Sequence, residues 1–163
     1  MKLISCGIIM CKVIGAELYV LLVHPGGPVW ANKDLGSWTI PKGLMEKDES
    51  EYVKTAIREF EEETGLVLPN CPLIPLGCTE TNSRIIHAWA FHGDCNVDEI
   101  QSNTFHMEWP SGSGIEQEFE EIDRGKFFSI KEARKYISPG QVPLLNIPLD
   151  VLLHPIQICQ KRI

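Results

Sequence analysis

Three glutamates occupy positions from which a helix would present them together. Glu59, Glu62 and Glu63 stand at i, i+3 and i+4, so their carboxylates would project from one helical face within a single turn. Like charges this close repel one another and would destabilise a plain helix. A hard divalent cation such as Mg2+ removes this penalty, because it prefers carboxylate oxygen and binds readily where phosphate oxygens complete its shell. The spacing therefore allows two interpretations, a metal site or a solvated acidic face.

The helix that must position these glutamates is expected from about Ser50 to Thr64. Asp48 or Ser50 can cap its N-terminus, and Gly65 is suited to end it in the left-handed conformation. The residues of its buried side recur with three-and-four spacing, and they are Tyr52, Val53, Ala56, Ile57 and Phe60. This apolar stripe leaves the acidic face directed away from the core.

The helix is the second half of a longer motif. Residues 58–66 match the pattern Arg-Glu-apolar-x-Glu-Glu-x-Gly-apolar in full, and the preceding loop contains Gly43 followed after five residues by Glu49. The two halves together resemble the box of the Nudix family. The resemblance implies an α/β fold, an α/β/α sandwich around a mixed β-sheet. It also implies hydrolysis of a pyrophosphate bond in a nucleoside diphosphate linked to another moiety, with Mg2+ as the cofactor and Mn2+ as its substitute.

The resemblance also implies roles for individual residues. Glu59, Glu62 and Glu63 would hold one to three metal ions, with the Gly43 carbonyl as a further ligand. Arg58 is placed to pair with Glu62 or to brace the cluster, so these four side chains form the expected catalytic set. Metal coordination lowers the pKa of water, and a glutamate then removes its proton. Glu62 and Glu63 are favoured as ligands, and the base is left open to a carboxylate outside the box.

The outside carboxylates stand in the stretch QEFEEID. The candidates are Glu118, Glu120 and Glu121, of which Glu118 is taken as a possible metal ligand. A solvated loop is the alternative for all three. The sequence does not decide between these interpretations.

One spacing departs from the family pattern. Eight residues separate Glu49 from Arg58, whereas the family has seven. Either the loop has gained a residue, or Glu51, which six residues separate from Arg58, takes over the bracing role of the first glutamate. How well the Gly43 carbonyl is aimed at a metal depends on the outcome.

Substrate contacts are expected around the start of the box. Lys42, which adjoins Gly43, and Arg84 could contact phosphate, although both could equally be ordinary surface residues. Trp38 precedes the loop by three residues and could line the site, while a tryptophan is more often part of the core. The opening W-x-x-P-K-G is similar to that of Nudix enzymes acting on dinucleoside polyphosphates and diphosphoinositol phosphates. Stretches within residues 7–140 resemble a bacterial group of small MutT-like Nudix pyrophosphohydrolases.

The other elements are expected from period and turn residues. Residues 94–114 are expected to be mostly loop, and Pro41-Lys42-Gly43 to break regular structure. The predicted strands are Ser5–Val13, Glu17–His24, Ser37–Ile40, Leu73–Thr79, Arg84–Gly93 and one within Phe119–Ile130. The further predicted helices are Lys131–Ile137 and Val142–Leu153. Without repeats or long linkers, residues 1–163 are expected to form a single domain.

Composition limits the partners. The formal charge of −7 and the lack of Lys and Arg clusters argue against a nucleic-acid surface. No apolar run approaches the roughly 18 residues of a spanning helix, so no membrane partner is expected. Six cysteines without CxxC pairs favour reduced, mostly buried thiols and a cytoplasmic location. The expected partner is a small-molecule nucleotide or polyphosphate, and the oligomeric state cannot be read from the sequence.

The sequence is compatible with two functions. The first is a metal-dependent pyrophosphohydrolase, which the retention of all three helix carboxylates favours. The second is a Nudix-fold nucleotide-binding module without turnover, which the extra residue in the box makes conceivable. A third, an acidic surface for protein contacts, fails to explain Gly43, Arg58 and Gly65 together.

Overall fold

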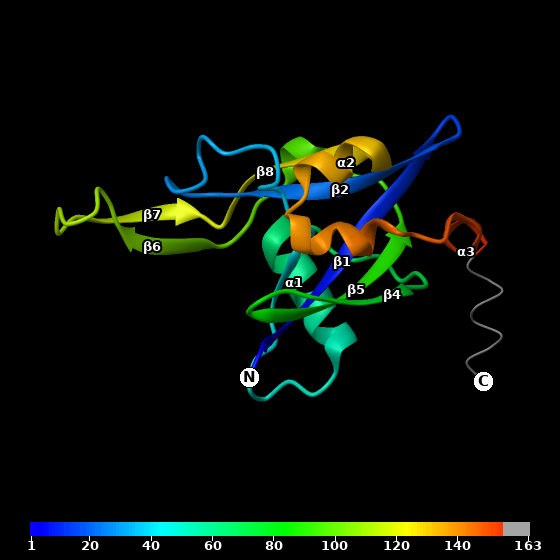
Figure 1. Cartoon of the computed structure of the whole chain (residues 1–163), viewed down its shortest axis with the longest axis horizontal. Coiled ribbons are helices and arrows are strands. Elements are labelled where there is room, and N and C mark those ends of the chain that lie inside the picture. The colour runs from blue at the N-terminus through cyan, green and yellow to red at the C-terminus, as the bar shows by residue number, and fades with distance from the viewer. Residues whose placement is uncertain (155–163) are drawn as a thin grey trace.

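The computed structural model describes residues 1–154, and a mixed β-sheet lies at its centre. Its six strands follow the order β4-β5-β1-β2-β8, with β3 paired to β1 at one end (Figure 1). All pairs are antiparallel except β1 with β5. The strands of this sheet are β1 (Leu3–Ile14), β2 (Glu17–Pro25), β3 (Lys42–Leu44), β4 (Ile74–Glu80), β5 (Arg84–His92) and β8 (Ile122–Ser129).

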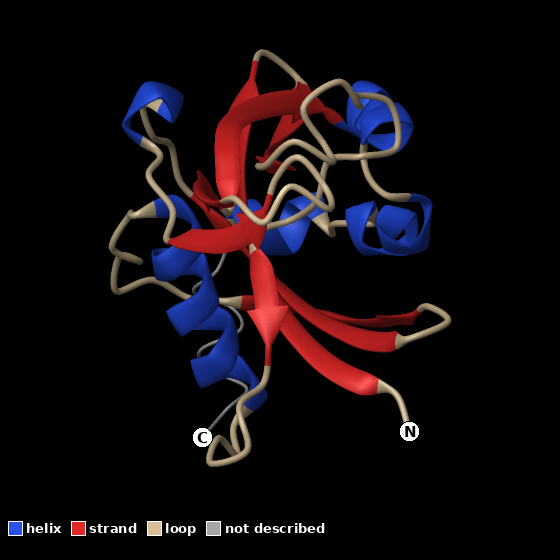
Figure 2. Ribbon diagram, turned by 90° about the vertical axis from the view of Figure 1, so that its left-hand side faces the viewer, coloured by secondary structure: helices blue, strands red, loops and turns tan. Residues whose placement is uncertain are grey.

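Helices cover both faces of the sheet (Figure 2). The bounds are α1 (Tyr52–Thr64), α2 (Ile130–Tyr136) and α3 (Leu149–Leu153), with the 3-10 helices η1 (Val97–Glu99) and η2 (Pro139–Leu145). On β1, Ile8 and Met10 pack toward Phe60 of α1, whereas the alternate residues Ile9 and Cys11 pack toward α2, η2 and α3. This alternation follows from the two-residue period of a strand. The predicted α/β/α arrangement is confirmed.

A separate two-stranded sheet projects from this body (Figure 1). It consists of β6 (Thr104–Glu108) and β7 (Glu116–Glu120). The prediction that residues 94–114 are mostly loop is confirmed, and η1 and β6 are the regular elements within them. The strand β6 has its hydrogen-bonding partner in β7, across the connection of residues 109–115.

Most predicted strands and one helix agree with the structure. The hairpins β1–β2 and β4–β5 and the helix α2 lie where expected, and Gly65 ends α1 with φ of 70°. The start of α1 differs, because its N-cap is Glu51 without a side-chain cap hydrogen bond, so neither Asp48 nor Ser50 caps it. Residues 42–44 form a strand instead of a break, since they pair with β1. Residues 37–40 contribute only isolated bridges.

The predicted helix Val142–Leu153 is divided. Pro148 separates η2 from α3, because proline cannot donate a backbone hydrogen bond and disfavours helical conformation in Ile147 before it.

The cysteines and the helices bear on the expected burial of thiols and on membrane spans. Within residues 1–154 the five cysteines are free, and only Cys6 and Cys11 are buried, so the expectation of mostly buried thiols is too strong; Cys159 lies outside the described residues. In the same range no helix has the length and apolar character needed to cross a membrane.

Candidate active site

The acidic face of α1 lies against β3 because the opposite face of the helix is held in the core. Ala56 and Phe60 are fully buried beneath the sheet, which directs Glu59 and Glu63 toward the short strand. A Cβ atom at Gly43 would overlap the carboxylate of Glu59. Glycine at position 43 is therefore required by the close approach of a glutamate.

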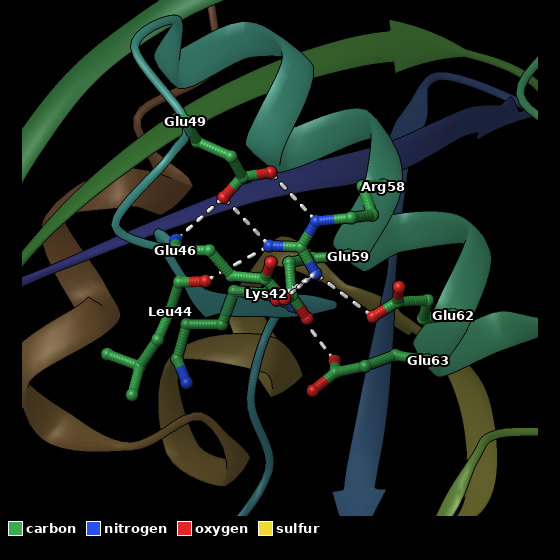
Figure 3. A network of polar contacts seen from close by, with 8 residues as sticks. All are labelled: Lys42, Leu44, Glu46, Glu49, Arg58, Glu59, Glu62 and Glu63. Carbon is green, nitrogen blue, oxygen red and sulfur yellow. Dashed lines mark hydrogen bonds and ion pairs between the residues drawn. The ribbon is translucent and has the colours of Figure 1, made fainter.

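Arg58 lies at the centre of the cluster (Figure 3). Its Nε and Nη2 donate to the two oxygens of Glu49, at 2.8 and 3.0 Å. Its Nη1 donates to Glu59 at 2.7 Å and to Glu62 at 3.0 Å. Nη2 also donates to the carbonyl of Leu44 at 3.1 Å, which ties the loop to the helix. One guanidinium thus holds three carboxylates in place, and the predicted pair of Arg58 with Glu62 is one of these contacts.

These contacts decide which glutamate braces the box. Hydrogen bonds from Arg58 hold the pKa of Glu49 well below its usual range, at about 2, and the same hydrogen bonds raise the pKa of Arg58. Glu51 instead pairs with Lys54 on the surface, at 2.6 Å. Glu49 therefore keeps the bracing role despite the extra residue.

Glu63 faces the backbone of the same strand. Its Oε2 accepts from the backbone N–H of Lys42 at 2.9 Å. Burial raises the pKa of Glu63 to about 8, with Glu59 and Glu121 adding to the shift and Lys42 opposing it. Burial likewise raises the pKa of Glu59, with Arg58 as the main opposing influence. The site thus concentrates more negative charge than its own cations balance.

Lys42 and Arg84 lie close enough for their charges to interact. Burial lowers the pKa of Lys42, and the positive charge of Arg84 lowers it further, whereas Glu63 and Glu59 act in the opposite sense. Lys42 on β3 therefore stands beside the acidic cluster, and Arg84 at the start of β5 stands near Lys42. Their contact with phosphate stays a prediction.

Glu121 joins the cluster from a distant part of the chain. Burial raises its pKa, and the charge of Glu62 raises it further. Its charge in turn raises the pKa values of Glu59 and Glu63. Four carboxylates from α1 and from the junction of β7 and β8 therefore share one electrostatic environment.

A short strip of backbone fixes Glu121 there. Gln101 N–H donates to the carbonyl of Thr64 at 2.9 Å, and Asn103 N–H donates to that of Glu62 at 3.3 Å. The carbonyl of Asn103 then accepts from the N–H of Glu121 at 2.9 Å. The end of α1 and Glu121 are thereby held on the two sides of residues 101–103.

The structure corrects the choice among the outside carboxylates. Glu118 lies on the projecting hairpin, where it accepts a hydrogen bond from the hydroxyl of Thr104, and is not brought to the cluster. Glu120 is exposed on the same strand. Glu121 is the member of the stretch that reaches the site, because the chain leaves the hairpin at this residue and turns into β8.

Trp38 belongs to the core and does not line the cluster. It is 3% exposed and packs edge-on against Phe128 and His24. Its Nε1 donates to Asp34 at 2.7 Å. Its ring lies in the layer opposite α1, which agrees with the alternative that a tryptophan is more often part of the core.

The donor set suits a hard divalent cation. Glu59, Glu62, Glu63 and Glu121 offer only oxygen, the atom that Mg2+ and Mn2+ prefer among protein ligands. Burial raises the pKa of three of them, and the charges of neighbouring carboxylates raise these pKa values further, so a bound cation would stabilise their charged forms. In residues 1–154, however, no three such side chains already converge on one ion position, since Arg58 holds Glu59 and Glu62. The oxygen donors fit a divalent cation, and binding of that cation would replace the hydrogen bonds of Arg58 to Glu59 and Glu62.

Comparisons with known proteins identify the family and the fold of this chain. The family described as NUDIX domain matches residues 3–146. Similar solved structures include a Caenorhabditis elegans Ap4A hydrolase in a binary complex, 18% identical over 88% of this chain and 92% of that one, with a TM-score of 0.59. A mutT/nudix family protein from Listeria innocua is 19% identical over 96% and 97%, with a TM-score of 0.57.

A third similar structure carries a ligand in its description. It is the NUDIX domain of Shewanella oneidensis NrtR complexed with ADP ribose, 14% identical over 99% of this chain and 88% of that one, with a TM-score of 0.55. No curated protein sequence gave a significant match. At these identities the structural likeness shows the fold alone.

Proposed function

Since this chain belongs to the Nudix family, we propose that it is a divalent-metal-dependent pyrophosphohydrolase. Its substrate is a nucleoside diphosphate linked to another moiety, such as a dinucleoside polyphosphate or another nucleoside polyphosphate. Mg2+ is the proposed cofactor, with Mn2+ as a substitute, and the cytoplasm is the proposed location. The observation that carries the proposal is the arrangement of the helix carboxylates, with Glu59 against Gly43, Glu62 on Arg58 and Glu63 on the backbone of Lys42.

The chemistry follows from charge. A pyrophosphate bridge repels an incoming oxygen nucleophile, so its negative charge must be neutralised where water is ionised. A bound divalent cation would screen the phosphate oxygens and make water more acidic. Glu59, Glu62 and Glu63, with the Gly43 carbonyl, are the residues that would hold it.

The remaining groups have separate tasks. Arg58 orients Glu59 and Glu62 and is itself oriented by Glu49, so it acts as a positioning residue. Glu121 is the proposed general base, because Asn103 holds it opposite Glu62 and because partial burial and the charge of Glu62 raise its pKa, which favours proton uptake. Lys42 and Arg84 are the proposed phosphate contacts. Trp38 and Glu118 are not retained, because of where the structure places them.

A binding module without turnover is the second candidate. The similar NUDIX domain described as complexed with ADP ribose favours it, since that description names a ligand and no reaction. Against it stands the intact bracing of the box, in which Glu49 still reaches Arg58 across the extra residue.

A screen of phosphate release tests the proposal. The purified protein is incubated with Mg2+ or Mn2+ and dinucleoside polyphosphates, nucleoside triphosphates, nucleotide sugars and dinucleotide cofactors, with Glu62→Gln in parallel. Metal-dependent cleavage that the variant loses is the expected result. Absence of cleavage with every compound, together with nucleotide binding that Glu62→Gln leaves intact, would replace the hydrolase by the binding module.

A further inference from the structure

An apolar cavity of about 380 Å³ opens beside the acidic cluster. Its walls come from the segment after β2 and from β6, and they include Val29, Trp30, Phe105, Met107 and Glu121. The volume lies in the range of pockets that bind small ligands, roughly 300–1,000 Å³. Glu121 lines this cavity, and Asn103 links its backbone to that of Glu62, so the cavity lies next to the end of α1.

The walls of the cavity are held together because the backbone after β2 lies close to the β7–β8 junction and to β6. Gly26 N–H donates to the carbonyl of Glu121 at 2.8 Å. Gly27 has φ of 85°, and a Cβ atom there would lie 2.8 Å from Cζ of Phe105. Segments about 80 residues apart are thus fixed against each other by contacts that only glycine permits. The cavity is a built feature of the fold.

Aromatic side chains are left accessible in this cavity. Trp30 is 38% exposed although it borders an apolar space. Lys33 lies over its indole ring, with Nζ 4.7 Å from the ring centroid, and helps to hold its orientation. Phe105 is partly buried and packs against Phe119 of the neighbouring strand. Supported aromatic rings of this kind are suited to stack on a flat heterocycle.

We infer that this cavity binds the base of a nucleotide substrate, stacked against Trp30 and Phe105, with the phosphate chain passing Glu121 toward α1. The inference rests on the proposed function, and it specifies where the base of the substrate binds, whereas the acidic cluster binds the phosphate end through a metal. The apolar aromatic cavity suits a flat, uncharged group, and the acidic metal site suits an anionic group. A ligand that fits both therefore carries a flat ring at one end and phosphate at the other.

A second cavity helps to locate the base. It measures about 530 Å³ and borders the same helix, with Lys54, Arg58, Glu61 and Glu62 among its lining residues. None of the residues that line it is aromatic. It therefore offers charge and hydrogen bonds but no stacking surface, and the base is assigned to the cavity with Trp30.

The test compares adenosine 5′-monophosphate with ribose 5-phosphate, which is the same molecule without its base. Calorimetric titration of the full chain is expected to give at least about tenfold tighter binding of the nucleotide, as stacking on an aromatic side chain provides. Trp30→Ala and Phe105→Ala should each reduce that preference several-fold, and Trp30→Phe should restore most of it. Cytidine and guanosine monophosphates then show how strongly the cavity selects its base.

Trp109→Ala is the matched control. This tryptophan is 36% exposed and lies on the same hairpin, yet it does not line the cavity. Its replacement should leave the preference for the nucleotide unchanged. Equal affinities of the two compounds, including no binding of either, would overturn the inference, as would equal losses in Trp30→Ala and Trp109→Ala.

Failure of this inference is separable from failure of the proposed function, since the titration needs no turnover. A base preference that depends on Trp30, without cleavage of any compound, leaves the inference standing and removes the hydrolase. Metal-dependent cleavage without a base preference does the reverse.

Discussion

Glu49 accepts two hydrogen bonds from Arg58, 2.8 Å from Nε and 3.0 Å from Nη2, across eight intervening residues. The extra residue is accommodated before the helix, because α1 begins only at Tyr52. The turn that absorbs it is closed by Glu49 itself, whose Oε2 accepts from the N–H of Glu46 at 2.7 Å. The spacing within the helix, on which the acidic face depends, is unaffected.

Glu49→Gln should reduce stability in a pH-dependent way. The pKa of Glu49 is lowered from 4.5 to about 2, chiefly by hydrogen bonds from Arg58, so this stabilisation is present above pH 4.5 and is lost as pH falls toward 2. At neutral pH the variant should lose about 1–3 kcal/mol, the range for hydrogen bonds to charged groups. Urea unfolding at several pH values should show the difference from wild type shrinking in acid.

Glu51→Gln is the control for this prediction. Its exposed pair with Lys54 should contribute only about 0–1 kcal/mol. Unfolding curves of wild type and Glu49→Gln that stay parallel from neutral to acid pH would contradict the role assigned to Glu49.

Metal binding should release protons through Glu63. Because its pKa is raised to about 8, chiefly by burial, Glu63 is largely protonated in the metal-free protein at neutral pH. A cation requires the carboxylate, so affinity for Mg2+ should rise with pH up to about 8 and then level off. Calorimetric titrations with Mg2+ in buffers of different ionisation enthalpy measure the released protons. An unchanged proton count in Glu63→Gln would show that another group supplies them.

Glu121→Gln should impair catalysis more than binding. Loss of a general base typically lowers kcat by about 10²–10⁴-fold, and KM should change little. The matched control is Glu118→Gln, which removes the same charge from the hairpin three residues earlier and should behave as wild type. Steady-state kinetics on the substrate found in the screen decide the matter. Comparable losses in both variants would point to a general effect of hairpin charge.

Gly43→Ala should disturb the cluster without removing any of its charges. The added Cβ would overlap the carboxylate of Glu59, so either β3 or this side chain must move. We expect weaker Mg2+ affinity, by at least about tenfold, and a lower Tm. Leu44→Ala, at a neighbouring position that is 39% exposed, serves as the control and should preserve metal affinity. Wild-type affinity in Gly43→Ala would show that the close approach is dispensable.

The box was predictable because its information is local. Glu59, Glu62 and Glu63 share a face through helical spacing alone, and Gly65 ends the helix through its own backbone preference. Neither feature depends on a distant partner. The same holds for the hairpin of β1 and β2, whose turn lies between two apolar runs.

The outside carboxylate was not predictable to the residue. Glu121 reaches the site because Asn103 bridges it to Glu62, a contact between segments with no common period or turn signal. Trp38 illustrates the opposite error, since proximity to the box along the chain did not place its ring there. A signal was present in Gly26 and Gly27, whose lack of a side chain lets the backbone approach Glu121 and Phe105.

The projecting hairpin of β6 and β7 supplies Phe105 and Met107 to the cavity but no strand to the central sheet. In the proposed function, selection of the base and cleavage of the phosphate chain would thus be carried by different parts of the chain, of which only the second belongs to the central sheet and α1. Residues 104–120 could be exchanged for another hairpin, provided that the entry at Asn103 and the exit at Glu121 are kept. The central sheet and α1 would then be the fixed part of the molecule, and the hairpin of β6 and β7 would be the part whose exchange changes the base that is bound.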